Sequence, residues 1–133
     1  MSIVFDESLH TGNELIDTQH QELIDRVNKL SESIETVKEK RTAVQTLDFL
    51  MDYTVFHFAA EEKLQEECGY PELEAHKALH AGFVKAVDEL KEMLEEEEGP
   101  TDAFVAAVNK NVVDWLVNHI QGCDKKVAEF VKA

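Results

Sequence analysis

The sequence predicts an all-α fold, an antiparallel up-down-up-down four-helix bundle with an N-terminal arm. The chain of 133 residues contains only five glycines and two prolines, most of them gathered at a few points, which favours long uninterrupted elements. Apolar residues recur at steps of three and four, the period of an amphipathic helix, and no segment alternates strictly between apolar and polar residues as a strand would. The length fits a single domain over residues 1–133.

The first half of the chain is expected to form the arm and two helices. The arm comprises residues 1–16, and the first helix follows over about residues 17–39. Asp17 is the expected N-cap, because a carboxylate can accept hydrogen bonds from the free amides of a first turn. The second helix is expected over about residues 42–67, where Thr42 and Gln45 have capping-box spacing. Gly69 can then take the left-handed conformation that ends many helices.

Two further helices are expected in the second half. The third runs over about residues 71–97 and starts at Pro71, whose missing amide costs nothing in a first turn. Gly99 and Pro100 separate it from the fourth helix, over about residues 102–131, which Thr101 and Asp102 can cap. Because each helix has one apolar stripe and the links are short, the four stripes should pack against one another.

Composition excludes several functional classes. Asp and Glu number 28 against 13 Lys and Arg, so the formal charge of −15 disfavours binding to nucleic acid or anionic lipid. No apolar run approaches the ~20 residues of a membrane span, and the first residues do not resemble a signal peptide. Cys68 and Cys123 are too few for a disulfide framework. We therefore expect a soluble, cytoplasmic, monomeric protein that binds neither nucleic acid nor membranes.

Ionisable side chains interrupt all four apolar stripes, although an isolated buried charge is strongly unfavourable. In chain order they are His20, His57, Glu61, His76, His80, His119 and Asp124. His57 and Glu61 form an i, i+4 pair, as do His76 and His80, so each pair lies on one helix face. A metal ion with bonds of ~2 Å can take both members of such a pair.

The spacing of His119 and Asp124 differs from that of the other pairs. Five residues apart, they would be rotated by about 140° in an ideal helix, so Asp124 is expected to approach from another direction, as a bridge between two metal ions would. In an antiparallel bundle all seven side chains meet at one end. A single histidine of this kind is more often a hydrogen-bonded core residue, but seven such side chains at one level favour a metal centre.

This pattern resembles the hemerythrins, in particular their single-domain bacterial members. The flanking residues 16–20, 68–71 and 115–120 agree, and the resemblance covers almost the whole chain. It implies a non-haem di-iron centre of two iron ions with an oxo or hydroxo bridge. It also implies the ligand roles: His76, His80 and His119 on one iron, His20 and His57 on the other, and Glu61 and Asp124 as bridging carboxylates.

Counting ligands points to O2 as the partner. Two octahedral irons offer about twelve positions, and these ligands with the oxygen bridge fill all but one, on the iron with two histidines. Five imidazoles and two carboxylates make a less electron-rich site than the carboxylate-dominated centres of ferritin-like proteins, which favours reversible binding of O2. The expected O2 pocket consists of apolar residues within a turn of the ligands, namely Leu23, Ile24, Phe58, Trp115, Leu116 and Ile120.

The leading interpretation is therefore an oxygen carrier for storage, delivery or scavenging, with no catalytic residues. A di-iron peroxidase or oxidase acting on peroxide, O2 or nitric oxide is one alternative, and a sensor of O2 or redox state is another. Gly122 is expected to leave space beside the iron, and Cys123 is either an ordinary core thiol or a redox-sensitive neighbour of the site. His10 lies outside the motif and is expected on the surface.

Overall fold

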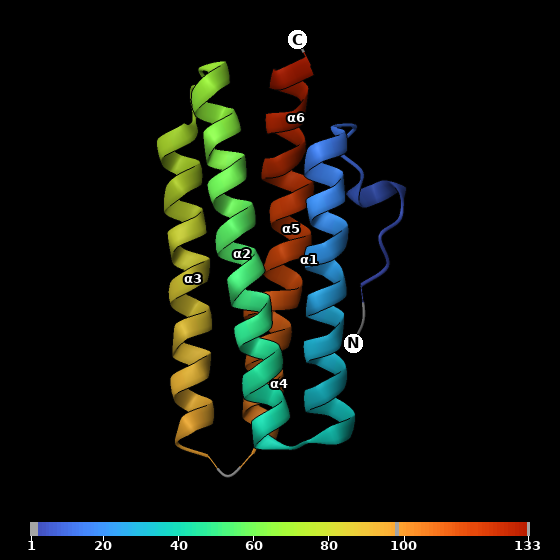
Figure 1. Cartoon of the computed structure of the whole chain (residues 1–133), viewed down its shortest axis with the longest axis vertical. Coiled ribbons are helices and arrows are strands. Elements are labelled where there is room, and N and C mark those ends of the chain that lie inside the picture. The colour runs from blue at the N-terminus through green and yellow to red at the C-terminus, as the bar shows by residue number, and fades with distance from the viewer. Residues whose placement is uncertain (1–2, 98, 133) are drawn as a thin grey trace.

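The computed structural model describes residues 3–97 and 99–132, and four long helical rods lie side by side in it (Figure 1). The first rod is α1 (Glu14–Glu32), continued by a π-helical turn, η2 (Ser33–Val37). The second and third are α2 (Lys40–Cys68) and α3 (Leu73–Glu95). The fourth is continuous and comprises α4 (Asp102–Val108), the π-helical η3 (Asn109–Asp114), α5 (Trp115–His119), the π-helical η4 (Ile120–Asp124) and α6 (Lys125–Lys132).

Successive rods run in opposite directions, which confirms the predicted up-down-up-down bundle (Figure 1). α1 packs against α2, α2 against α3, and α3 against α4 and η3, while η3 also contacts α1 and so closes the bundle. The core between the rods is apolar and fully buried, with Val27, Leu50, Leu90 and Val108 contributed by different rods. None of the described helices is long and apolar enough to span a membrane.

Two of the predicted helix ends are confirmed. Gly69 follows Cys68 with φ of 70°, in the left-handed region, and its N–H donates to carbonyl oxygens of the last turn of α2. At the start of the fourth rod, Thr101 Oγ1 accepts a hydrogen bond of 3.1 Å from the N–H of Phe104. Both ends follow from residue types whose conformation or side-chain acceptor suits the position.

The predicted start of the first helix is wrong. Asn13 is the N-cap, and its Oδ1 accepts from the N–H of Ile16 at 3.1 Å, so α1 begins at Glu14 and the arm is shorter than predicted. Asp17 instead lies within the helix, where its carboxylate accepts from the N–H groups of Thr11 (2.8 Å) and Gly12 (3.2 Å). Its side chain therefore ties the arm to the helix rather than capping it.

The predicted starts of the second and third helices are also wrong. α2 begins two residues before Thr42, directly after a turn in which Lys38 takes a left-handed conformation with φ of 57°, and no capping-box bond forms. Thr42 Oγ1 instead donates to Glu39 Oε2 at 3.3 Å. Pro71 precedes α3, because it lies in a turn closed by a hydrogen bond from Leu73 N–H to the carbonyl oxygen of Tyr70.

The N-terminal arm lies along the outside of the bundle next to α1 (Figure 1). Asn28 of α1 holds it by two hydrogen bonds to the backbone of Ile3, of 2.7 and 2.9 Å. A short 3-10 turn, η1 (Glu7–Leu9), then buries the side chain of Leu9 in the main core.

Candidate metal centre

All seven residues singled out by the sequence lie toward one end of the bundle, where α1 and α3 begin and α2 and the fourth rod approach their ends. Their exposed fractions are 6% or less. The antiparallel topology explains the convergence, because early positions of two helices are level with late positions of the other two. Ionisable groups this deeply buried require partners that satisfy them.

The seven side chains form two overlapping groups of potential metal ligands. One group comprises Glu61, His76, His80, His119 and Asp124, and the other comprises His20, His57, Glu61 and Asp124. Within each group the donor atoms lie within 4.8 Å of one another. We call them the three-histidine group and the two-histidine group. Glu61 and Asp124 belong to both, which is the arrangement expected of carboxylates placed between two metal ions.

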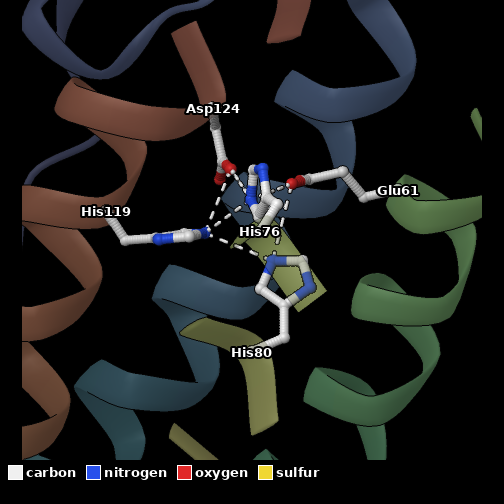
Figure 2. A group of neighbouring side chains, drawn as sticks. All are labelled: Glu61, His76, His80, His119 and Asp124. Carbon is white, nitrogen blue, oxygen red and sulfur yellow. Dashed lines mark hydrogen bonds and ion pairs between the residues drawn. The ribbon is translucent and has the colours of Figure 1, made fainter. Parts of the chain in front are cut away.

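The three-histidine group converges through the Nε2 atoms of its rings. Figure 2 shows the His76 ring between the carboxylates of Glu61 and Asp124, at 2.9 and 3.1 Å from their nearest oxygens. His119 Nε2 lies 3.0 Å from His76 Nε2 and 3.2 Å from His80 Nε2. Three imidazoles that bring the same ring nitrogen to one point fit a shared metal ion. In neutral rings, two Nε2 atoms can form a hydrogen bond only if one of them carries a proton and the other does not.

The two-histidine group holds polar atoms that are close together but unsatisfied. His20 Nε2 is 2.8 Å from Asp124 Oδ2, and His57 Nε2 is 3.2 Å from Glu61 Oε2. None of these four atoms has a partner in hydrogen-bond geometry among the described residues. Buried polar atoms in native proteins rarely lack one, and a metal ion would satisfy all four. Imidazole nitrogen with carboxylate oxygen is a donor set that suits iron, zinc or manganese.

A π-helical turn brings His119 and Asp124 together, and the predicted difference in direction between them is wrong. His119 directly precedes η4 and Asp124 is its last residue, and the hydrogen bonds of this π-helical turn span five residues, so the turn is wider than in an α-helix. Asp124 Oδ1 consequently lies 3.2 Å from His119 Nε2. Asp124 reaches both groups because its two oxygens point apart, one to His119 and His76 and the other to His20.

Comparison with known proteins agrees with this geometry. The family model described as "Hemerythrin HHE cation binding domain" matches residues 11–131. The chain belongs to the hemerythrin family. It is 36% identical over 131 residues to a bacteriohemerythrin of Stenotrophomonas maltophilia, which covers 98% of this chain and 82% of the relative. It is 30% identical over 122 residues to a myohemerythrin of Theromyzon tessulatum, which covers 92% and 88% of the two chains.

Solved hemerythrin structures share the fold of this family member. A wild-type hemerythrin aligns with a TM-score of 0.76 and 33% identity, over 90% of this chain and 88% of the other. A hemerythrin point mutant aligns with a TM-score of 0.83 and 30% identity over the full length of both chains.

Electrostatics in this hemerythrin-family site keep the carboxylates ionised. Burial and the charge of Asp124 both act to raise the pKa of Glu61, but contacts with the imidazoles of His57, His76 and His80 outweigh them and lower it from 4.5 to about 2. The pKa of Asp124 is also lowered, because its contacts with histidines outweigh the effect of burial. Burial acts to lower the pKa of His76, but the two carboxylates raise it from 6.5 to about 9.

Three residues that the sequence analysis did not single out contact the outer nitrogens of the histidines. Gln19 Oε1 lies 2.7 Å from His57 Nδ1, Glu62 Oε2 lies 2.8 Å from His80 Nδ1, and Gln65 Nε2 lies 3.1 Å from His76 Nδ1. A histidine that binds a metal through one nitrogen commonly donates its other N–H to such a partner, which fixes the ring. The available signal was proximity in sequence, since each partner lies within four residues of a predicted ligand.

The Gln65 amide shows which proton arrangement a metal would require. With a metal on Nε2, His76 Nδ1 carries the proton and needs an acceptor, but it faces the amide nitrogen of Gln65. Gln65 Oε1 meanwhile is buried without a hydrogen-bond partner among the described residues. Half a turn of the amide would exchange its two ends and pair Oε1 with the His76 N–H, and it would give up the 3.4 Å hydrogen bond that Gln65 Nε2 donates to Glu61 Oε1.

The apolar residues predicted to line an O2 pocket belong to the main core or pack against it, and two of them contact ligand histidines. Leu23, Ile24, Phe58, Leu116 and Ile120 are buried in the main core, and Trp115 packs against it half-buried. The Phe58 ring stacks on His80 at a centroid distance of 3.8 Å, and the Trp115 ring stacks on His119 at 4.4 Å. These two aromatic rings therefore cover the three-histidine group.

A surface cleft lies next to the cluster. Gly122 and Cys123 line a cleft of about 210 Å³ together with His76, and a Cβ built on Gly122 would meet no atom within 4 Å. Both cysteines are free thiols. His10 is exposed on the arm, as expected, and stacks on Phe5 at 4.5 Å.

Proposed function

We propose that this protein binds O2 reversibly at a non-haem di-iron centre and acts as an oxygen carrier rather than an enzyme. In this proposal the three-histidine group holds one iron, the two-histidine group holds the other, and Glu61 and Asp124 bridge them. The observation that supports it most directly is that the two ligand groups share these two carboxylates and no other residue. The cation-binding description of the family model, and relatives named bacteriohemerythrin and myohemerythrin, support the same conclusion.

The donor set fits iron used for carriage. Five neutral imidazoles and two carboxylates leave the site less negatively charged than carboxylate-dominated centres, so high oxidation states are less stabilised. Two bound ferrous ions would supply the electrons for a reversible reduction of O2. The lowered pKa values keep Glu61 and Asp124 ionised, and both carboxylates lie within reach of both groups, so they can act as ligands without first losing a proton.

The surrounding side chains would keep water and protons out of the site. Phe58 and Trp115 stack on histidines of the three-histidine group and would shield it. Leu23 and Ile24 follow His20 by three and four residues and are each 1% exposed, so they lie on the side of the two-histidine group. We propose that O2 binds on this side, where one ligand fewer leaves a position open.

The experiment is a cycle of O2 addition and removal on protein loaded with ferrous iron under nitrogen, followed by its charge-transfer absorption. Reversible bleaching over several cycles, with two irons per chain, is the expected result. Irreversible conversion to a ferric form, or steady peroxide consumption in the presence of a reductant, would contradict carriage and favour an oxidase or peroxidase. An iron content far from two per chain would contradict the centre itself.

A further inference from the structure

The two ligand groups differ in what their histidines contact on the outside of the site. In the three-histidine group, His80 Nδ1 lies 2.8 Å from a carboxylate oxygen of Glu62. In the two-histidine group, His57 Nδ1 lies 2.7 Å from the amide oxygen of Gln19. Both rings turn Nε2 toward Glu61, so with a metal on Nε2 each Nδ1 carries a proton and donates it. One histidine thus donates to an anion and the other to a neutral group.

This difference changes the two imidazoles as metal ligands. A carboxylate pulls the Nδ1 proton toward itself, which leaves more electron density on the ring and makes Nε2 the stronger donor. A stronger donor stabilises the more highly charged state of a metal ion. The ion beside His80 should therefore be stabilised in its oxidised state more than the ion beside His57.

We propose that Glu62, acting through His80, lowers the reduction potential of the ion in the three-histidine group, so that this ion is oxidised before the ion in the two-histidine group. Glu62 touches neither metal nor O2 and is a positioning residue. The inference rests on the proposed di-iron centre. It adds an order of oxidation to that centre and names the residue that sets it.

The surroundings of Glu62 fix the contact and set its strength. Phe58 stacks on His80 with an angle of only 2° between the ring planes, which holds Nδ1 toward Glu62. The Glu62 side chain is 25% exposed and lines a groove of about 450 Å³ between α2 and α3. Water reaches one side of the carboxylate. We therefore expect Glu62 to change the preference of the site for the oxidised over the reduced ion by about tenfold, at the lower end of the range for such partners. Tenfold corresponds to about 59 mV for a one-electron couple.

The test is an anaerobic redox titration of the iron-loaded protein that resolves two midpoint potentials. Glu62→Gln keeps the shape and a hydrogen-bond acceptor but removes the charge, and it should raise the lower potential by about 59 mV and leave the higher one unchanged. Gln19→Glu makes the opposite change on the other side and should lower the higher potential. Glu66→Gln is the matched control, because Glu66 is exposed one turn further along α2 and its carboxylate has no contact with a histidine in the described structure.

Equal shifts in Glu62→Gln and Glu66→Gln would overturn the proposal, since a general charge effect would then explain both. A shift of the higher potential by Glu62→Gln would overturn it as well. If Glu62→Gln does not fold or does not bind iron, the titration of Gln19→Glu tests the inference in its place. Unchanged potentials in that variant would refute the inference.

A second readout uses zinc, which has no redox chemistry. In the zinc-loaded protein the nitrogen-15 shift of His80 Nδ1 should differ between wild type and Glu62→Gln, and identical shifts would show that the contact does not act on the ring. Failure of the proposed function is distinguishable, because the potentials are measured under nitrogen. Irreversible O2 uptake with the predicted potentials would refute carriage and leave the role of Glu62 standing.

Discussion

Asp124→Ala is the substitution that most sharply separates a metal centre from an ordinary polar core. Asp124 Oδ2 lies 2.8 Å from His20, and Oδ1 lies 3.1 and 3.2 Å from His76 and His119. One truncation therefore removes a potential ligand from both groups. The prediction is that the variant loses most of the stabilisation that metal confers on wild type.

The size of the loss follows from ligand linkage. Free metal at a thousandfold its dissociation constant stabilises a folded protein by about 4 kcal/mol per site, or about 8 kcal/mol for two. If loss of the ligand weakens each site about a hundredfold, the same metal concentration stabilises by only about 1.4 kcal/mol per site. The difference of about 5 kcal/mol corresponds to roughly 20 °C in Tm for a chain of this length.

The assay is thermal unfolding of metal-free and zinc-loaded protein, because zinc avoids oxidation during heating. Asp114→Ala is the matched control, since Asp114 is exposed on the same rod and the chemical change is identical. The control should gain as much from zinc as wild type does. If Asp124→Ala also gained the full increment, Asp124 would not be a ligand of either group, and the reasoning would be refuted.

Three further predictions concern protons, access and the helix ends. The pKa of His76 is raised from 6.5 to about 9, so metal-free protein should be destabilised as pH rises from 6.5 through 9, and metal loading at pH 7.5 should release a proton. Thermal unfolding across that range and calorimetry in buffers of different ionisation enthalpy check the two effects, and a flat profile without proton release would contradict them. Gly122→Leu should fill the cleft beside His76 and slow O2 association and autoxidation in stopped-flow measurements, whereas unchanged rates would show that O2 does not enter there. Gly69→Ala should lower the free energy of unfolding in urea by about 1 kcal/mol, because Gly69 has a φ of 70°. Gly82 lies in the interior of α3 with open space around a new Cβ, so Gly82→Ala should raise the free energy of unfolding by up to about 1 kcal/mol. Equal effects of the two alanines would contradict the conformational argument.

The sequence was sufficient to predict the bundle and the convergence of the ligand candidates, because both depend on simple periodicities. His57 with Glu61, and His76 with His80, share helix faces at i, i+4, and the antiparallel order makes early and late positions level. Gly69 ends α2 as predicted because few other residues take its conformation cheaply.

The π-helical turns could not be predicted in the same way. They depend on whether each amide donates to the carbonyl four or five residues earlier, and the spacing of the apolar residues is compatible with both patterns. The spacing of His119 and Asp124 contained the signal, but an ideal α-helix was the wrong reference geometry for it.

Helix starts and outer contacts were missed for a different reason. Asn13 and Asp17 are both good N-cap residues, and only the path of the arm decides between them. Glu62 and Gln19 become partners only through the orientation of each ring, which spacing along a helix does not define.

The central claim is reversible O2 binding at a paired iron site, and the uptake of O2 per chain tests it most directly. Fully reduced, iron-loaded protein should take up about one O2 per chain, because one coordination position is left open, and should return it on evacuation over repeated cycles. Uptake that is not returned, or that continues beyond this amount while a reductant is consumed, would contradict the account.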